Sequence, residues 1–276
     1  MSVTVGQAVL LGIVQGLTEF LPVSSTAHLA LAQRFLPGFA QPGILFDVLL
    51  HVGTLFALVV YFRSRITTTL AGAFSSDPPE RRKALKLIGL LVLAVGLTGL
   101  LTMPLSRFAI EGMTEFRRMG VALLGMSVLL LVAQRVGRAR GERGRTLEEM
   151  RPRDAALVGA CQSVSAILHG FSRSGNTISV GLFTGLSRRA AAEFSFLLSI
   201  PTILAAAAVE NVSAFRHGGG ALDAAAWPVY LVGMAVAAVV GYVAIAALLR
   251  LVISMRLVPF IAYTGALGLF LLVRSA

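Results

Sequence analysis

Residues 15–31 read QGLTEFLPVSSTAHLAL, a stretch that places ionisable and hydroxyl side chains inside an otherwise apolar region. Pro22 lacks a backbone donor and stops a helix from running through the stretch. The serine pair that follows favours the start of a new helix. The stretch therefore predicts a helix, a break and a second helix. In so apolar a chain, a carboxylate (Glu19) and an imidazole (His28) beside broken backbone indicate a functional site. A proline-kinked membrane helix is the simpler alternative.

The composition is that of a polytopic membrane protein. Of the 276 residues, 56% are hydrophobic and 13% are charged, whereas soluble domains carry about 25% charged residues. The net charge of +11 raises the question of nucleic acid. However, the basic residues lie in loops between apolar runs, which membrane orientation explains better. We therefore expect no nucleic-acid partner, and we expect one membrane domain over residues 1–276.

Six apolar runs are about as long as a bilayer span, which takes about 20 residues. They cover approximately residues 44–62, 84–105, 116–136, 190–212, 227–249 and 257–273. Two shorter runs, residues 6–21 and 25–35, together predict a re-entrant hairpin with its tip at the Pro22 break. Residues 159–185 repeat this pattern around a second polar break, HGFSRSGN, at residues 169–176. The expected fold class is an all-α polytopic membrane protein with six transmembrane helices and two re-entrant helix hairpins.

The two halves of the chain, about residues 1–136 and 154–276, resemble each other weakly. Three pairs of residues align between them: Gly12 with Gly159, Gln15 with Gln162, and Ser25 with Ser172. Each half holds a hairpin followed by three spans, an odd number, so the second half must be inverted relative to the first. The sequence thus predicts an inverted-topology repeat, in which two broken elements meet near the membrane midplane.

The basic residues also predict an orientation. If neither hairpin crosses the bilayer, seventeen of the 24 Lys and Arg residues lie on one side and six on the other, with Arg173 set aside. The positive side of a membrane protein faces the cytoplasm. We therefore expect both termini, and the opening of the site, to face outward from the inner (plasma) membrane of a bacterial cell.

The first break offers groups for a cation and for an anion. Gln15 and Glu19 are four residues apart, so they share a helical face and can hold one ligand together. Ser24, Ser25 and Thr26 begin the next half-helix, whose exposed N–H groups favour anions. The carboxylate beside an anion site indicates either a metal ion or acid–base chemistry.

The second break forms a comparable cradle. Arg173 offers a planar fork suited to phosphate oxygens, and Gly175 lets backbone come close to a ligand. The other polar residues of this break are Ser172, Ser174, Asn176 and Thr177. Two half-helix starts and one buried arginine inside a membrane predict phosphate chemistry on a lipid.

The motifs EFLPVSSTAH and HGFSRSGNTIS resemble the two signature motifs of the undecaprenyl-pyrophosphate phosphatase family of the bacitracin-resistance type. The segment AAEFSFLLSIPT from Ala191 is also similar to that family, and the similarity spans essentially the whole chain. The resemblance implies an integral membrane enzyme that removes the terminal phosphate of the C55 isoprenoid pyrophosphate. It implies a divalent cation, Mg²⁺ or Ca²⁺, as cofactor. The partners it implies are undecaprenyl pyrophosphate and bilayer lipid, while the oligomeric state, including a homodimer, stays open.

The resemblance also carries over residue by residue. It assigns Gln15, Glu19, Ser25 and His28 in the first motif, and Ser172, Arg173, Ser174 and Thr177 in the second. Three residues depart from the family pattern: Gln15 for the commoner glutamate, Ala27 for glycine and His169 for proline. The first of these removes one charge from the expected metal site.

These assignments predict hydrolysis of the phosphoanhydride. Arg173 and the half-helix starts would bind the pyrophosphate, and Glu19, helped by Gln15, would hold the cation. Ser25 is the candidate nucleophile, with His28 as general base or leaving-group acid. Two alternatives stay open here: the adjacent serine, Ser24, can equally face the phosphate, or water activated by Glu19 or His28 attacks directly.

A competing interpretation comes from another class of protein. Inverted repeats with broken helices are typical of transporters, so a transporter or lipid flippase is the alternative to an enzyme.

Outside the two breaks, His51 is expected to be a hydrogen-bonded core residue. Asp47 and Glu193 are expected either to support the site or to complement helix ends.

Overall fold

The computed structural model describes residues 3–40, 44–106, 115–140, 143–216, 226–254 and 256–274. In these ranges the chain forms helices and no strand beyond a single isolated bridge. The helices are α1 Val5–Thr18, α2 Ser25–Phe35, α3 Ile44–Tyr61, α4 Arg63–Ala73, α5 Pro78–Ser106, α6 Glu115–Arg140, α7 Pro152–Ile167, α8 Arg173–Thr184, α9 Arg188–Arg216, α10 Trp227–Ile253 and α11 Val258–Arg274.

Both breaks lie where the sequence predicts them. The first helix ends at Thr18, and α2 begins after Ser24, whose Oγ accepts a hydrogen bond from the N–H of Ala27 at 3.4 Å. In the second hairpin α8 begins after Ser172, whose Oγ accepts from the N–H of Gly175 at 3.2 Å. A serine that caps the first free N–H groups explains each restart.

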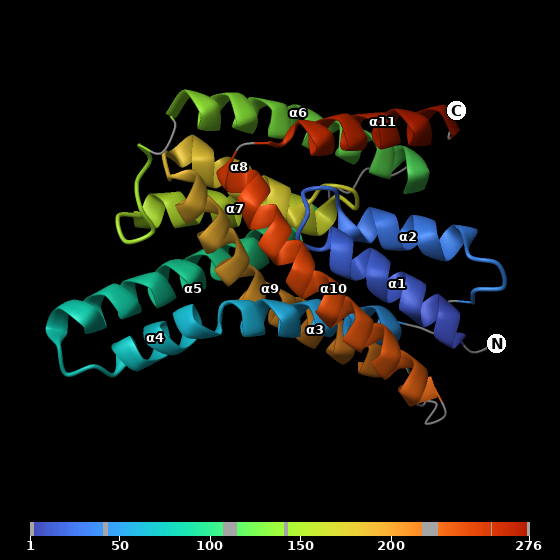
Figure 1. Ribbon diagram of the computed structural model, residues 1–276, viewed down its shortest axis with the longest axis horizontal. Coiled ribbons are helices and arrows are strands. Elements are labelled where there is room, and N and C mark those ends of the chain that lie inside the picture. The colour runs from blue at the N-terminus through green and yellow to red at the C-terminus, as the bar shows by residue number, and fades with distance from the viewer. Residues whose placement is uncertain are drawn as a thin grey trace.

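The two hairpins enter the molecule from opposite ends, and their breaks meet in the middle (Figure 1). The hydroxyls of Ser172 and Ser174 lie 3.4 and 3.3 Å from the carbonyl oxygen of Leu21 in the other break. Gly175 makes this approach possible, because a Cβ atom there would lie 2.9 Å from Pro22 Cβ. Both termini lie at the end from which the first hairpin enters (Figure 1).

The first arm of each hairpin packs on a long helix of the other half, α1 on α10 and α7 on α5. Glycines permit this close packing, as they do between membrane helices generally. A Cβ at Gly12 would lie 2.6 Å from Gly233 O, and one at Gly159 would lie 2.3 Å from Ala94 O. Gly12 and Gly159 are one of the pairs that align between the halves of the sequence.

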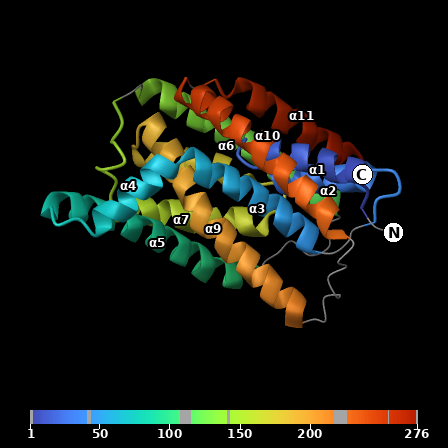
Figure 2. The ribbon, with the colours of Figure 1, turned by 60° about the horizontal axis from the view of Figure 1, so that its bottom comes forward.

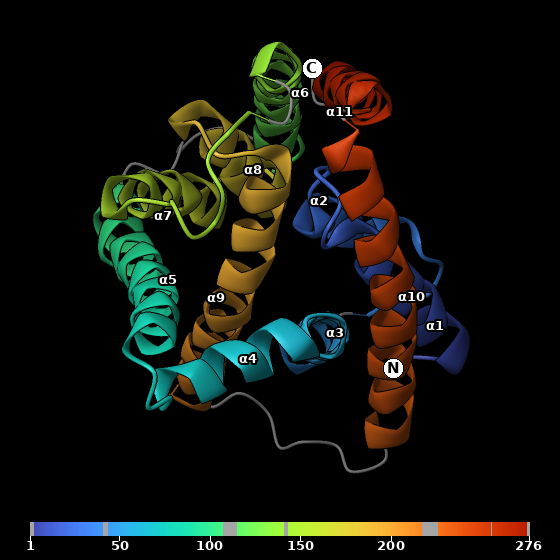
Figure 3. The same ribbon diagram turned by 60° about the vertical axis from the view of Figure 1, so that its left-hand side comes forward.

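A third glycine contact lies between α6 and α11, which run side by side along one edge of the molecule (Figures 2 and 3). A Cβ at Gly120 would lie 3.0 Å from Gly268 O, and one at Gly268 would lie 2.9 Å from Gly120 O. The last helix of each half therefore meets its counterpart in the other half.

The caps correct one detail of the sequence alignment. The alignment pairs Ser25 with Ser172, whereas the structure gives the capping role to Ser24 and Ser172. The second break is therefore one residue longer than the first, measured from the aligned glycines. Arg173 thus occupies the position in α8 that Ser25 occupies in α2.

Helix length and composition in the described residues confirm only part of the six predicted spans. Four helices, α5, α6, α9 and α10, are long and apolar enough to cross a membrane, and a fifth span results if α3 and α4 are counted as one. These two helices meet at an angle of 71° beside Phe62, and α4 occupies a segment expected to be a loop. The last helix, α11, has 17 residues. Among the described residues the fold is all-helical with four to five candidate spans.

Candidate functional site

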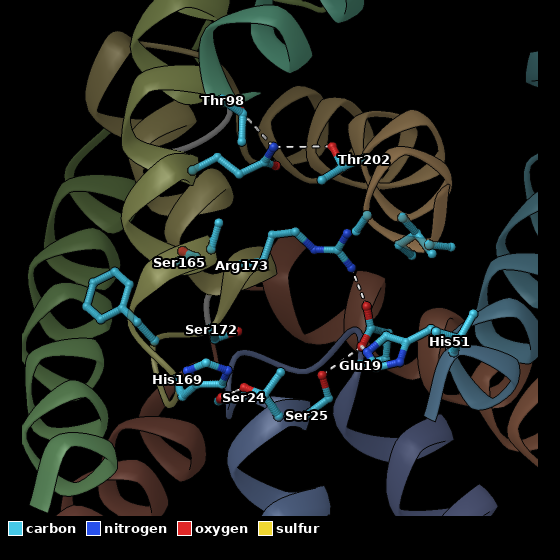
Figure 4. Close-up of a pocket in the computed structure, with 18 residues that line it drawn as sticks. Glu19, Ser24, Ser25, His51, Thr98, Ser165, His169, Ser172, Arg173 and Thr202 are labelled. Carbon is cyan, nitrogen blue, oxygen red and sulfur yellow. Dashed lines mark hydrogen bonds and ion pairs between the residues drawn. The ribbon is translucent and has the colours of Figure 1, made fainter. Parts of the chain in front are cut away.

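The site is built around an ion pair between the two breaks. Glu19 caps the C-terminus of α1, and Arg173 is the first residue of α8. Arg173 Nη2 contacts Glu19 Oε1 (Figure 4). The Glu19 side chain is 4% exposed and that of Arg173 is 19% exposed. The buried carboxylate is therefore compensated by a cation from the opposite half of the chain.

The second carboxylate oxygen of Glu19 is also surrounded. Glu19 Oε2 accepts hydrogen bonds from Gln15 Nε2 at 2.9 Å and from Ser25 Oγ at 2.7 Å. The Nε2 atom of His51 lies 3.6 Å from the same oxygen. Since the Ser25 hydroxyl points at a carboxylate, its proton has an acceptor within hydrogen-bonding distance.

The neighbouring hydroxyls hold the shape of the first break. The Ser24 hydroxyl caps α2 and lies 3.1 Å from Thr26 Oγ1. Ser24 has a φ of +72°, the only positive φ outside glycine among the described residues. Strained backbone of this kind concentrates at functional sites. Of the two adjacent serines, only Ser25 donates to Glu19.

In the second break, two predicted residues line the cavity and four support it. Ser172 and Arg173 face the cavity. The support residues are Ser174, Gly175, Asn176 and Thr177, all buried. Asn176 Nδ2 donates to Cys161 O at 2.6 Å and to Ser165 Oγ at 2.9 Å, and Thr177 Oγ1 lies 2.6 Å from Ser195 Oγ. These bonds tie α8 to α7 and α9, and so fix the position of Arg173, the first residue of α8.

The breaks open into a cavity of about 260 Å³. Its polar wall includes Glu19, Ser24, Ser25, Thr26, His51, Ser172 and Arg173. Apolar side chains of α3 and α9, among them Val48, Ile203 and Ala206, complete the lining. Charged groups beside an apolar wall suit a ligand that carries an anionic head and a hydrocarbon portion.

The histidines are arranged differently from the expectation. His28 is absent from the cavity wall: its Nδ1 lies 2.7 Å from Ser24 O and its Nε2 lies 2.6 Å from the hydroxyl of Tyr263. His51, expected to be a core residue, lines the cavity with its Nε2 facing Glu19. His169 lines the cavity as well.

Sequence reasoning also overlooked an uncharged part of the wall, formed by Thr98, Ser165 and Thr202. Gln162, singled out only as the counterpart of Gln15, belongs to it too. The two acidic residues left open lie elsewhere: Glu193 Oε1 is 3.0 Å from Arg65 Nε, and Asp47 accepts from Gln33 Nε2 at 2.7 Å. Neither lines this cavity.

The donor set suits a cation only in part. The described residues contain no cluster of three or more His, Cys, Asp or Glu side chains able to hold a metal ion. They do offer the Glu19 carboxylate and the buried Gln15 Oε1, which has no hydrogen-bond partner. Mg²⁺ is commonly held by one or two carboxylates together with substrate phosphates and water. Glu19 could therefore contribute one ligand to a divalent cation that binds with a phosphate-bearing ligand, whereas Gln15 lies outside the cavity wall.

Comparison with known proteins agrees with this picture. Residues 8–270 match the family model described as "Bacitracin resistance protein BacA". The chain is 40% identical over 261 residues to an "Undecaprenyl-diphosphatase" of Syntrophotalea carbinolica, with 95% of each chain covered. It is 42% identical over 275 residues to the protein of the same description from Gemmatimonas aurantiaca, with 96% of each covered. An "Undecaprenyl-diphosphatase 2" of Streptomyces coelicolor is 35% identical over 285 residues, which cover 97% of this chain and 93% of that one.

Proposed function

Since the chain belongs to the bacitracin resistance protein BacA family, we propose that it is an undecaprenyl-diphosphatase, a membrane phosphatase. It hydrolyses undecaprenyl pyrophosphate to undecaprenyl phosphate and inorganic phosphate, and so recycles the lipid carrier of cell-wall synthesis. The observation that carries the proposal is the meeting of Arg173, Glu19 and Ser25 at one cavity, because these three groups supply an anion site, a base and a nucleophile.

Residues of the second break bind most of the pyrophosphate. The Arg173 guanidinium can present parallel N–H groups to phosphate oxygens, and the starts of α2 and α8 add free backbone N–H groups. The apolar wall formed by Val48, Ile203 and Ala206 accommodates the first part of the isoprenoid. The longer remainder of the chain lies in bilayer lipid.

The chemical step favoured by the geometry begins at Ser25. Its Oγ attacks the terminal phosphorus while its proton passes to Glu19 Oε2, 2.7 Å away. The bond from that phosphorus to the bridging oxygen breaks, and undecaprenyl phosphate leaves. Water then releases the phosphate from Ser25. Direct attack by water is the alternative route, in which the Ser25 hydroxyl only orients the phosphate.

Of the two histidines, His51 is the better placed to exchange a proton at the site. It faces Glu19 and the cavity, whereas both ring nitrogens of His28 lie against Ser24 O and Tyr263. His28 remains the histidine that the motif resemblance indicates. A comparison of variants at the two positions, described below, decides between them.

A divalent cation, Mg²⁺ or Ca²⁺, belongs to the proposal. Glu19 and Gln15 would hold it, because they provide a carboxylate and an unpartnered amide oxygen on one helical face. Such a cation neutralises charge on the phosphates when bound. Removal of divalent ions with EDTA should abolish phosphate release, and addition of Mg²⁺ or Ca²⁺ should restore it.

The membrane arrangement that we propose has six spans and two re-entrant hairpins in an inverted repeat. The glycine contacts support it, since Gly12 and Gly159 each pack on the other half, and Gly120 meets Gly268. The helix ends and loops that carry most of the arginines lie at the end of the molecule opposite both termini (Figure 1). The termini and the site would then face outward from a bacterial inner membrane.

One experiment separates the enzyme from the transporter. Detergent-purified protein is incubated with undecaprenyl pyrophosphate, and inorganic phosphate is measured over time. Release that depends on Arg173 supports the phosphatase. If the lipid stays intact in detergent while the protein moves it between the leaflets of a vesicle, the chain is a flippase instead.

A further inference from the structure

The uncharged part of the cavity wall has no role in the steps described above. Thr98 comes from α5 and Thr202 from α9, and both lie on the opposite side of Arg173 from Glu19 and Ser25 (Figure 4). Gln162 of α7 joins them, since its Nε2 donates to Thr98 Oγ1 at 3.0 Å and to Thr202 Oγ1 at 3.2 Å. Three helices thus hold a single amide group at the edge of the cavity.

The orientation of this amide is fixed by its partners. The Thr98 hydroxyl has carbonyl acceptors at Ala94 O, 2.8 Å away, and Gly159 O, 2.9 Å away. The Thr202 hydroxyl donates to Leu198 O at 2.8 Å. Because both hydroxyl protons are directed to backbone carbonyls, each threonine oxygen can only accept from the amide. The nitrogen must therefore point at the threonines, and Oε1 must be the free end.

This free end lacks a partner. Gln162 is 2% exposed, and its Oε1 atom is buried without a hydrogen bond. A buried acceptor left unpaired costs about 1–3 kcal/mol, so such an atom in a folded protein calls for an explanation. Gln162 is part of the cavity wall, so a small shift of its side chain would let a molecule inside the cavity supply the missing donor. An amide oxygen repels phosphate oxygens, which are acceptors too, and it attracts the O–H of water.

We propose that Gln162 holds the water molecule that attacks phosphorus in the hydrolysis, with Thr98 and Thr202 as positioning residues. The proposal rests on the phosphatase function given above. Glutamine orients the attacking water in other phosphoryl-transfer enzymes. The water oxygen bonds to phosphorus, and the bond from phosphorus to the leaving oxygen breaks. One water proton goes to that leaving oxygen, and the other stays on the released phosphate. The leaving oxygen is Ser25 Oγ if the serine is phosphorylated first, and the lipid phosphate oxygen if it is not.

The test compares two glutamines that are both buried. In Gln162→Leu the acceptor is lost, so kcat for phosphate release from undecaprenyl pyrophosphate should fall about 100-fold, the typical cost of a misplaced reactant. KM should stay within about twofold of wild type, because Arg173 still binds the phosphate. The control is Gln134→Leu. Gln134 accepts from the N–H of Leu257 at 3.0 Å and lies outside the cavity wall, so this change should lower the melting temperature and leave kcat unchanged.

A second variant tests the role independently of folding. In Gln162→Glu, a protonated carboxyl keeps the shape of the amide, with an O–H for a threonine and a carbonyl for water. The ionised form donates nothing and repels phosphate. The kcat of this variant, relative to wild type at each pH, should therefore rise as the pH falls, whereas the relative kcat of Gln162→Leu should stay flat.

Three results would overturn the proposal. The first is an unchanged kcat in Gln162→Leu. The second is a rise in KM alone in that variant, which would make the amide part of phosphate binding. The third is a relative kcat of Gln162→Glu that does not respond to pH. Failure of the phosphatase function itself looks different, because the wild-type protein would then release no phosphate at all.

Discussion

Arg173 and Glu19 pair across the meeting point of two hairpins that belong to different halves of the chain. Neither half contains a complete site. The carboxylate, its glutamine neighbour and the candidate nucleophile come from the first break, and the guanidinium comes from the second. Because the pair is largely buried, loss of either partner leaves an uncompensated charge in a poorly hydrated place. Substitutions at these two positions should therefore affect folding and activity together.

Arg173→Lys should lower phosphate release by at least about 100-fold, although the charge is kept, because a point charge cannot reproduce the planar fork. Turnover is measured on purified protein that still melts cooperatively. Arg82→Lys, at an exposed position of α5, is the control and should leave turnover unchanged. Near-normal turnover of Arg173→Lys would remove this arginine from the site.

The two adjacent serines should behave differently. Ser25→Ala should reduce turnover by at least about 1,000-fold if the serine is the nucleophile. Ser24→Ala removes a helix cap worth about 1 kcal/mol and should keep turnover within about tenfold. Rapid acid quench and mass spectrometry should find phosphate on Ser25. A Ser25→Ala variant that retains substantial turnover would favour direct attack by water.

The two histidines offer a third comparison. His51→Gln should lower kcat/KM by at least about 100-fold, because this imidazole faces Glu19 and the cavity. His28→Gln should keep kcat/KM within about tenfold of wild type but lower the melting temperature, because it loses the bonds to Ser24 O and Tyr263. The reverse pattern would return the proton-transfer role to His28.

A prediction about stability concerns Asp154, which lies at the end of the molecule opposite the termini. Burial alone would raise the pKa of Asp154, but hydrogen bonds from Arg145 at 2.5 Å and from the N–H of Arg151 at 2.8 Å hold that pKa below its usual value. The unfolded chain then binds more protons, so this stabilisation is complete above about pH 4 to 5 and is lost as the pH falls through the folded value. Asp154→Asn should melt well below wild type at pH 7, and the difference should narrow with acidification. A constant difference would contradict the linkage.

Orientation can be tested by labelling in intact bacteria. In a Cys161→Ala background, Ala40→Cys should react with an impermeant thiol reagent added from outside, because it follows α2 at the end that holds the termini. Ser76→Cys, exposed between α4 and α5, should react only after the cells are broken. The opposite pattern would overturn the proposed topology.

The sequence predicted the elements that have a local cause. Pro22 and the serine pair marked the first break, the polar segment at residues 169–176 marked the second, and the weak repeat indicated that the breaks would meet. Helix α4 escaped prediction because its start carries no side-chain cap at Phe62 and its sequence is polar. The direction of His51 could not be read from an apolar run, in which all faces of the helix look alike. The partners of Gln162 come from α5 and α9, so only the packed fold reveals them.

The packing of α1 on α10 has a consequence for how the chain is made. Helix α1 is synthesised long before α10, the helix on which it packs most extensively. Until α10 is made, the close-packing glycine surface of α1 lacks its partner helix, although Arg173 is already available to pair with Glu19. The insertion machinery or the surrounding lipid must hold the N-terminal hairpin during this interval. The packing that holds the first hairpin in place is therefore completed only after α10 has been synthesised.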